Sequence, residues 1–214
     1  VPNFRDAYER KEELHYYTPE EYIRYASSAW NIATEIVFYD YYVFFAIAYY
    51  TGARKGEIHA LRWTDLRNGS IHITKSITQK LRGDDRETPP KNKSSNRVVQ
   101  LPKPLIDILK EHKERGRAYK GFNNDYYICG GIRPLRDSTL SKMNFRIADD
   151  AGLHHIRIHD FRHSHASLLA NNGVNILEIS RRLGHSNIEQ TLNTYSHFYP
   201  QEEDKALSIL NKIR

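Results

Sequence analysis

The chain has 214 residues, of which 39% are hydrophobic, enough for one sizeable core and too few for two full ones. A formal net charge of +6 favours polyanionic partners, and the single cysteine, Cys129, excludes an internal disulfide and a cysteine-rich zinc site and fits the cytoplasm. The longest apolar run, from Ile36 to Tyr50, is interrupted by Asp40 and is shorter than the ~20 residues that span a bilayer, so we expect a buried helix and no membrane partner.

Two helices are expected near the start of the chain. Thr18, Pro19 and Glu21 form a helix-start pattern, with a hydroxyl cap, a proline in the first turn and an acid that closes a capping box. A second, strongly aromatic helix is predicted over about Ile32 to Tyr50, ending before Gly52, which suits a left-handed cap. Its aromatic side chains stand at helical spacing among apolar neighbours, which favours a place in the core over stacking on bases.

A short helix through Ile58 to Leu61 is predicted to precede a small antiparallel sheet. Asn68-Gly69 predicts a tight turn between two extended runs, and the alternation of Ser70 to Lys75 predicts a strand. The polar stretch from Gln79 to Ser95 is expected to be a long surface hairpin or loop. After it, Arg97 to Leu101 resumes an extended pattern.

The middle of the chain predicts two helices and one short strand. The first helix begins at Pro104 and runs towards His112, and the basic stretch from Lys110 to Lys120 is interpreted as its solvated end rather than as a track for a DNA backbone. Tyr126 to Cys129 is expected to be a short strand. The second helix is predicted from about Ser138 to Asp150.

The last third of the chain is predicted to be helical. A helix from Asp160 to Ala170 is followed by one that Asn175 caps and Gly184 ends. Ser186 is predicted to start a further helix, which carries Tyr195. The predicted fold class is therefore mainly α with a small antiparallel β-sheet (α+β).

Two arginines are candidates to hold a phosphate. An attacked phosphodiester gathers negative charge on its non-bridging oxygens, and a planar guanidinium offers forked donors to that geometry. Arg54 follows the predicted end of the aromatic helix. Arg162 lies three residues after His159, so the side chains of His159 and Arg162 can face one point. Glu57, three residues after Arg54, can fix the orientation of that arginine.

Tyr195 is the candidate nucleophile, ten residues after His185 in the sequence LGH. A phenol with an ordinary pKa of about 10 is mostly protonated at neutral pH, so its attack needs a nearby base or a stabilised phenolate. Histidines and arginines can supply both. The resulting phosphotyrosine ester would store the energy of the broken phosphodiester, so that a sugar hydroxyl could reverse the step without ATP.

The leaving sugar oxygen needs a proton, and a lysine on the polar hairpin is a sensible donor. Lys93 is our choice for this acid. Three other lysines flank the same segment, and the chemistry of the residues does not choose among them: they are Lys75, Lys80 and Lys91.

Three segments of the chain, taken in order, resemble the catalytic domain of the tyrosine recombinases, close to the integrases of phages and conjugative transposons: TGARKGEIHALRWTDL, PPKNKSSNRVVQLP and HDFRHSHASLLANNGVNILEISRRLGHSNIEQTLNTYSH. The resemblance covers the chain from about Tyr17 to His197. It implies a DNA breaking-rejoining enzyme fold and a site-specific recombinase that integrates and excises a mobile element through a 3′-phosphotyrosyl intermediate, with Tyr195 as the nucleophile. The phosphate-activating residues that it implies are Arg54, Lys93, His159, Arg162 and His185.

The resemblance also implies a domain organisation and partners. Residues 17–199 would form the catalytic domain, residues 1–16 a lead-in from a missing N-terminal DNA-binding region, and residues 200–214 a C-terminal tail helix. The expected partner is double-stranded DNA at an attachment or core site, on which the protein would form a homotetramer, with a monomer in isolation. Apolar tail residues such as Leu207 and Leu210 stand at helical spacing and can dock on a neighbouring protomer or on their own domain.

Other functions are compatible with parts of this pattern. A type IB topoisomerase-like nicking and closing enzyme uses similar chemistry, and a non-catalytic DNA-binding regulator could keep the fold; the LGHSN-to-Tyr195 spacing and the intact set of six residues favour the recombinase. His159 and His163 have the i, i+4 spacing of a metal pair, but no HExxH pattern is present and arginines already supply positive charge, so neither a metal nor another cofactor is expected. The roles of His163 and His165 stay open.

Overall fold

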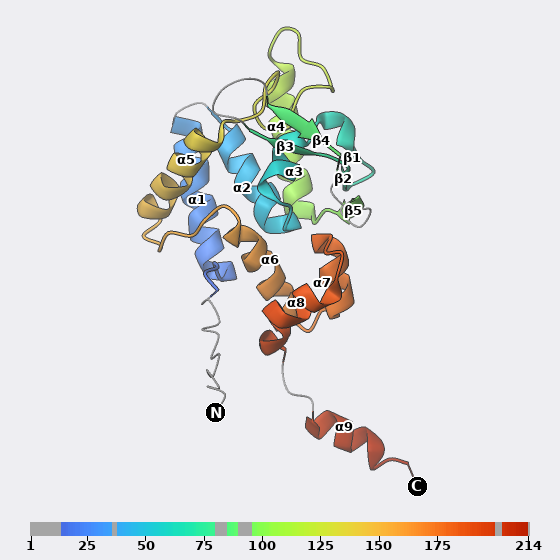
Figure 1. Ribbon diagram of the computed structural model, residues 1–214. Coiled ribbons are helices and arrows are strands. Elements are labelled where there is room, and N and C mark those ends of the chain that lie inside the picture. The colour runs from blue at the N-terminus through green and yellow to red at the C-terminus, as the bar shows by residue number, and fades with distance from the viewer. Residues whose placement is uncertain (1–13, 36–37, 80–84, 90–95, 200–202, 214) are drawn as a thin grey trace, which may run out of the picture.

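The structure is a computed structural model that describes residues 14–35, 38–79, 85–89, 96–199 and 203–213. Within these residues it is mainly helical, with small antiparallel sheets beside the helices, so the predicted fold class is confirmed (Figure 1). The helices are α1 (Pro19–Glu35), α2 (Asp40–Thr51), α3 (Lys55–Ala60), α4 (Lys103–Arg117), α5 (Asp137–Asp150), α6 (Asp160–Asn171), α7 (Ile176–Leu183), α8 (Ile188–Tyr195) and α9 (Glu203–Leu210). The strands are β1 (Leu66–Arg67), β2 (Ser70–Ile73), β3 (Ser76–Thr78), β4 (Arg86–Thr88) and β5 (Arg97–Gln100).

Helix α1 begins where the capping box predicts. The backbone N–H of Thr18 donates to Oε2 of Glu21 at 2.8 Å, and the N–H of Glu21 donates to Oγ1 of Thr18 at 3.3 Å. The predicted start of the second helix is wrong, because α1 continues to Glu35 and α2 begins only at Asp40. Asp40, which interrupts the apolar run in the sequence, places its carboxylate in the first turn of α2, where the helix dipole favours negative charge.

Helix α2 runs through the centre of the molecule and packs against α1, α4 and α6. Its side chains Val43, Phe44, Phe45 and Ile47 are almost fully buried, which confirms that the aromatic run belongs to the core. The helix ends at Gly52, which has a φ of 64° and takes the left-handed conformation that was predicted for this cap. The chain that follows this glycine leads directly to Arg54.

A three-stranded antiparallel sheet with the order β1-β2-β5 lies beside the helices. Asn68 and Gly69 join β1 to β2 with φ values of 49° and 70°, as the predicted tight turn requires. Ile71 on β2 lies opposite Val99 on β5, and both side chains are buried. Strand β4 lies within the predicted polar stretch and forms a separate antiparallel pair with β3, which ends just before Gln79. Three of the candidate lysines, Lys80, Lys91 and Lys93, lie outside the described residues.

The strand predicted over Tyr126 to Cys129 is wrong. Tyr127 makes only isolated bridges, with Arg62 and with Gly131, and no ladder follows in this part of the described chain. The reason is the pair of glycines that follows, because Gly131 has a φ of 78° and Gly130 one of 112°. These conformations turn the chain back on itself before a strand can extend.

Helices α6, α7 and α8 share a second, smaller cluster of buried side chains. Its members are Ala166, Ala170, Ile179, Leu183 and Tyr195. Asn175 caps α7 as predicted, since its side chain accepts the N–H of Leu177 at 2.9 Å. The predicted cap of α8 is off by one position: Asn187 rather than Ser186 provides the oxygen, which accepts the N–H of Glu189 at 2.9 Å.

Helix α9 lies away from the remainder of the molecule in Figure 1. Four apolar side chains in α9 and just after it are exposed: Leu207, Ile209, Leu210 and Ile213. None of the helices in the described part of the chain has the length and apolar character needed to cross a membrane.

Candidate active site

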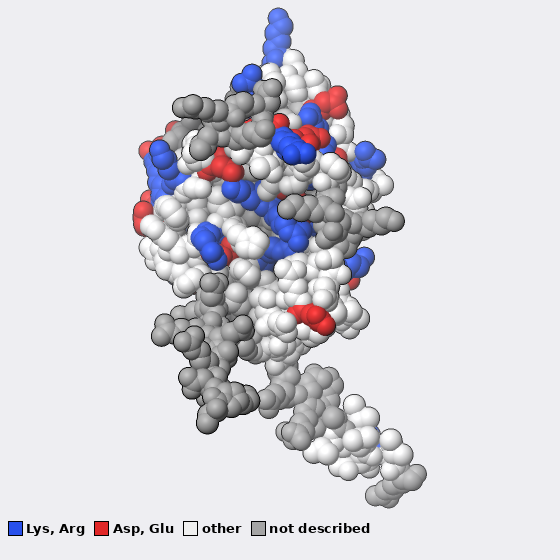
Figure 2. All heavy atoms as spheres, in the orientation of Figure 1, with Lys and Arg blue, Asp and Glu red and all other residues white. Residues whose placement is uncertain are grey.

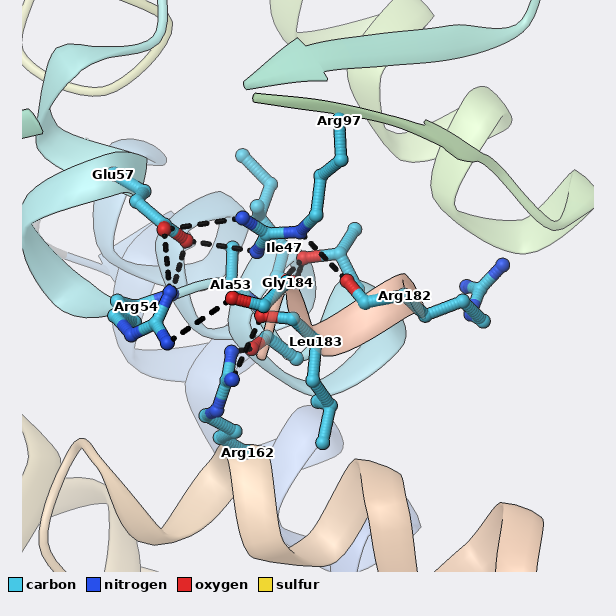
Figure 3. Close-up of polar contacts among 11 residues, drawn as sticks. Ile47, Ala53, Arg54, Glu57, Arg97, Arg162, Arg182, Leu183 and Gly184 are labelled. Atoms are coloured by element: carbon cyan, nitrogen blue, oxygen red, sulfur yellow. Dashed lines mark hydrogen bonds and ion pairs between the residues drawn. The ribbon is translucent and has the colours of Figure 1, made fainter. Parts of the chain in front are cut away.

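Arg162 lies at the centre of the candidate site. It belongs to the first turn of α6, and only 3% of its surface is exposed. Its Nη1 donates to the carbonyl oxygen of Gly52 at 2.7 Å, and its Nη2 donates to that of Leu183, also at 2.7 Å (Figure 3). Gly52 and Leu183 end α2 and α7, so the guanidinium meets the negative ends of two helix dipoles. Burial, with Arg54 and Arg97 nearby, lowers the pKa of Arg162 to about 9, which still leaves it charged at neutral pH.

Glu57 joins two further arginines at this point. Arg54 donates from Nη1 to Oε1 of Glu57 at 3.0 Å and from its backbone N–H to Oε2 at 2.8 Å. Arg97 donates to the same carboxylate from Nη1 at 3.1 Å and from Nη2 at 2.8 Å. Burial raises the pKa of the Glu57 carboxyl, but the hydrogen bonds and charges of Arg97 and Arg54 outweigh it, and the pKa lies below its ordinary value.

The end of α7 is held by arginines from three separate parts of the chain. Three successive carbonyl oxygens accept one hydrogen bond each: Arg182 from Nε of Arg97 at 2.7 Å, Leu183 from Nη2 of Arg162 at 2.7 Å and Gly184 from Nη2 of Arg54 at 3.5 Å (Figure 3). Gly184 has a φ of 67°, and a Cβ on it would lie 2.9 Å from Nη1 of Arg97. A side chain at this position would meet both a left-handed backbone and the guanidinium of Arg97, and glycine avoids both. The turn therefore fixes the position of the next residue, His185.

Arg97 is a member of the site that the sequence did not single out. The sequence pattern marks it only as the first residue of an extended run. It is the N-terminal residue of β5, with 9% of its surface exposed. An arginine that opens an apolar strand is a weak signal, because most such side chains reach solvent. The long-range contact with Glu57, 40 residues away in sequence, is what buries it.

His159 and His185 stand beside the arginines as neutral rings. His159 is the residue that precedes α6, and burial, followed by the charge of Arg162, lowers its pKa. Nδ1 of His185 lies 2.8 Å from Oγ1 of Thr191 on α8. Burial, with Arg162 and Arg54 nearby, lowers the pKa of His185 to about 3. Both imidazoles are therefore uncharged at neutral pH, so each can donate one N–H and accept one hydrogen bond.

Tyr195, the last residue of α8, is docked inside its own chain. Only 1% of its surface is exposed, and its phenol oxygen lies 2.8 Å from Nδ1 of His163. Burial raises the pKa of the phenol to about 12, although the charge of Arg162 acts in the opposite direction. The sequence left the role of His163 open, and the structure places it against the candidate nucleophile.

His165, by contrast, makes contacts that link helices to one another. Nδ1 of His165 lies 2.9 Å from the carbonyl oxygen of Tyr49 on α2, and Nε of Arg182 donates to its Nε2 at 3.4 Å. Burial, together with the nearby charge of Arg182, lowers its pKa to about 3. The ring therefore links α6 to α2 and to α7 rather than facing the candidate nucleophile.

Five of the six sequence-predicted site residues come together between α3, α6, α7 and α8: Arg54, His159, Arg162, His185 and Tyr195. The sixth, Lys93, lies outside the described residues. Glu57, the predicted partner of Arg54, contacts Arg54 directly. Figure 2 shows Lys and Arg side chains gathered across the middle of the face that contains α3 and α6. Within the described part of the chain, no group of three or more His, Cys, Asp and Glu side chains could hold a metal ion.

The arrangement combines anion binding with a protected phenol. Arg54, Arg162 and the neutral imidazoles can surround a phosphate, and the phenol of Tyr195 lies in an apolar cluster at the edge of the same site. Such a set can bind a phosphodiester and attack it from a tyrosine oxygen.

A family model described as the phage integrase family matches residues 28–202. The ICEBs1 integrase of Bacillus subtilis (strain 168) is 30% identical over 211 residues, which cover 95% of this chain and 56% of the relative. A protein named tyrosine recombinase XerC-like, from Caldanaerobacter subterraneus subsp. tengcongensis, is 33% identical over 189 residues, covering 79% of this chain and 48% of the relative. The chain thus spans about half the length of these curated relatives.

Among solved structures, the fold is similar to that of the Tn1549 transposon integrase in complex with a circular intermediate DNA. The TM-score is 0.75 at 21% sequence identity, over 96% of this chain and 67% of that one. This likeness supports the fold, and the match of the family model covers most of the chain, including all five residues of the described site. The chain belongs to the phage integrase family.

Proposed function

We propose that the protein is a site-specific DNA recombinase that cuts and rejoins strands through a 3′-phosphotyrosyl intermediate during integration and excision of a mobile element. The observation that carries the proposal is the docked Tyr195, with its phenol beside the cluster that contains Arg162. Family membership and the relative named as an integrase support the same function. Residues 17–199 would form the catalytic domain, following a lead-in over residues 1–16.

In this mechanism, Arg54 and Arg162 bind the non-bridging oxygens of the scissile phosphate. Two bonds to carbonyls leave further N–H donors on the guanidinium of Arg162, because the group carries five. His159 and His185 complete the cluster as neutral hydrogen-bonding groups. Because both rings are uncharged at neutral pH, neither repels the arginines that bind the phosphate.

The chemical step exchanges one ester for another. The phenol oxygen of Tyr195 forms a bond to phosphorus, the bond from phosphorus to the 5′ oxygen of the next nucleotide breaks, and the leaving oxygen takes a proton from Lys93, our proposed acid. The reverse step uses a 5′ hydroxyl as the nucleophile and releases the phenol. No cofactor is consumed in either direction.

The proposed partner is double-stranded DNA at an attachment or core site, in the cytoplasm. The net charge of +6 and the face on which Lys and Arg side chains gather favour such a polyanion. On DNA we propose a homotetramer, with a monomer in isolation, and the exposed apolar residues of α9, Leu207 and Leu210 among them, would be covered by a neighbouring protomer. Crosslinking of the free and the DNA-bound protein distinguishes this arrangement from docking of α9 on its own domain.

The test is a nicked suicide substrate with the cognate site, which traps the covalent complex because the cleaved strand diffuses away. We expect an adduct that is stable to denaturation, and none with Arg162→Ala. The regulator hypothesis instead predicts binding without any adduct. A topoisomerase-like enzyme would form the adduct but would relax supercoiled DNA without exchanging strands between two sites.

A further inference from the structure

His163 contacts the atom that the proposed function makes reactive. It follows Arg162 on α6, and its Nδ1 lies 2.8 Å from the phenol oxygen of Tyr195 on α8. The two ring centroids are 5.9 Å apart, and the ring of His163 meets that of His159 edge-on at 5.5 Å. Among the hydrogen bonds between described residues, this is the one that joins a histidine to Tyr195.

The direction of this hydrogen bond follows from the two protonation states. Burial raises the pKa of the Tyr195 phenol to about 12, so the oxygen carries its proton at neutral pH. Burial, followed by the influence of His159, lowers the pKa of His163 to about 4, so its ring is neutral. The phenol therefore donates and Nδ1 accepts, which places the proton of the imidazole on Nε2.

Neither of the other two histidines of the site makes this contact. Nδ1 of His185 lies beside the hydroxyl oxygen of Thr191, and the ring of His159 meets that of His163 edge-on. A general base must lie within about 2.6–3.2 Å of the oxygen from which it takes a proton. His163 meets this requirement before DNA arrives.

We propose that His163 is the general base for Tyr195, which makes it a further catalytic residue of the reaction. The assignment rests on the proposed function. During cleavage the phenol proton moves to Nδ1 of His163 as the phenol oxygen bonds to phosphorus, and the bond to the leaving 5′ oxygen breaks while that oxygen receives a proton from the proposed acid. During rejoining the 5′ hydroxyl oxygen bonds to phosphorus and gives its proton back to the proposed acid, while the bond from the phenol oxygen to phosphorus breaks and the imidazolium returns its proton to that oxygen.

The charges around His163 change when a phosphodiester binds. In the DNA-free structure His159, Arg162 and Arg157 lower the pKa of His163, and Asp160 raises it. A bound phosphate places negative charge against Arg162 and offsets the cations, so the pKa of His163 rises in the complex. His163 is therefore a stronger base in the DNA complex, in which it takes the phenol proton.

Two substitutions separate proton transfer from simple positioning. His163→Ala removes the imidazole, whereas His163→Asn keeps a polar atom close to the position of Nδ1 but has no basic nitrogen. Single-turnover formation of the covalent complex is measured with saturating suicide substrate as a function of pH. We expect both variants to lose roughly 10²- to 10⁴-fold in rate, the usual size of a general-base contribution. His155→Ala, an exposed histidine away from the site, is the matched control and should react at the unsubstituted rate.

The pH profile gives the sharper distinction. The rate of the unsubstituted protein should depend much less steeply on pH than the rates of the variants, because His163 takes the phenol proton and no phenolate has to form first. Without a base only the phenolate attacks, so the rate of both variants should rise about tenfold per pH unit. Added imidazole should restore part of the rate of His163→Ala.

A His163→Asn variant that reacts at the unsubstituted rate would show that this histidine only positions the phenol, and it would overturn the proposal. A flat pH profile for His163→Ala, with no response to imidazole, would overturn it as well. Failure of the unsubstituted protein to form any adduct would refute the proposed function itself, and the assignment with it. The two failures are thus distinguished by the reaction of the unsubstituted protein.

Discussion

Replacement of Arg97 by methionine tests whether the buried ion pair organises the phosphate-binding arginines. The substitution keeps an unbranched side chain in the space but removes hydrogen bonds to described residues, among them two to Glu57 at 3.1 and 2.8 Å and one to the carbonyl of Arg182 at 2.7 Å. Removing one partner of a buried pair costs about 3–5 kcal/mol. Since Arg54 keeps its own bonds to the Glu57 carboxylate, we expect the free energy of unfolding to fall by the lower end of this range, about 3 kcal/mol.

The matched control is Arg136→Met. Arg136 also makes two bonds to one carboxylate, at 2.9 and 3.0 Å to Asp85, but half of its side chain is exposed. A surface pair contributes at most about 1 kcal/mol, so this variant should lose no more than that. Urea unfolding followed by circular dichroism measures both changes in the free energy of unfolding.

The sign of the pH dependence gives a second readout of the same pair. The pKa of Glu57 is lower in the folded state than its ordinary value, so its contribution to stability is complete above the ordinary carboxyl pKa and is lost as pH falls through the folded value. The difference between the unsubstituted protein and Arg97→Met should therefore shrink on acidification. Equal losses for Arg97→Met and Arg136→Met, or a difference that does not change with pH, would refute the reasoning.

Two further results are expected. Gly184→Ala should lower both stability and the cleavage rate, because a Cβ would lie 2.9 Å from Nη1 of Arg97 at a φ of 67°. The control Gly152→Ala has a φ of 63° and no atom within 4 Å of the added carbon, so it should lose only about 1–2 kcal/mol to backbone strain and leave cleavage unchanged. Unfolding curves and adduct yields compare the two variants, and equal effects would contradict the proposed contact. A chelator such as EDTA should leave adduct formation unaffected, since arginines provide the positive charge, and strong inhibition would support a metal instead.

Local sequence signals located the ends of several helices correctly. The Thr18–Glu21 capping box and the glycines at positions 52 and 184 act within a few residues, so their patterns can be read without knowledge of the fold. The break between α1 and α2 escaped prediction because both helices bury their aromatic side chains, and the apolar pattern therefore continues across it. The short strand expected over Tyr126 to Cys129 failed because the turn that follows governs that segment.

The site shows the same division between local and long-range information. The residue types of Arg54, Arg162 and Tyr195 reveal what each side chain can do, and their order in the chain carried the family resemblance. Arg97 and His163 acquire their positions from contacts 40 and 32 residues away in sequence. Periodicity cannot show which carboxylate buries an arginine or which imidazole receives a phenol.

The central claim is that Tyr195 is the nucleophile of a DNA-cleaving site, and mapping the covalent complex tests it most directly. The complex trapped on the suicide substrate is digested with a protease, and the peptide that carries the nucleotide is sequenced by mass spectrometry. We predict that the adduct lies on Tyr195, and that Tyr195→Phe binds the same DNA but forms no adduct. An adduct on another residue, or one that persists in Tyr195→Phe, would contradict the claim.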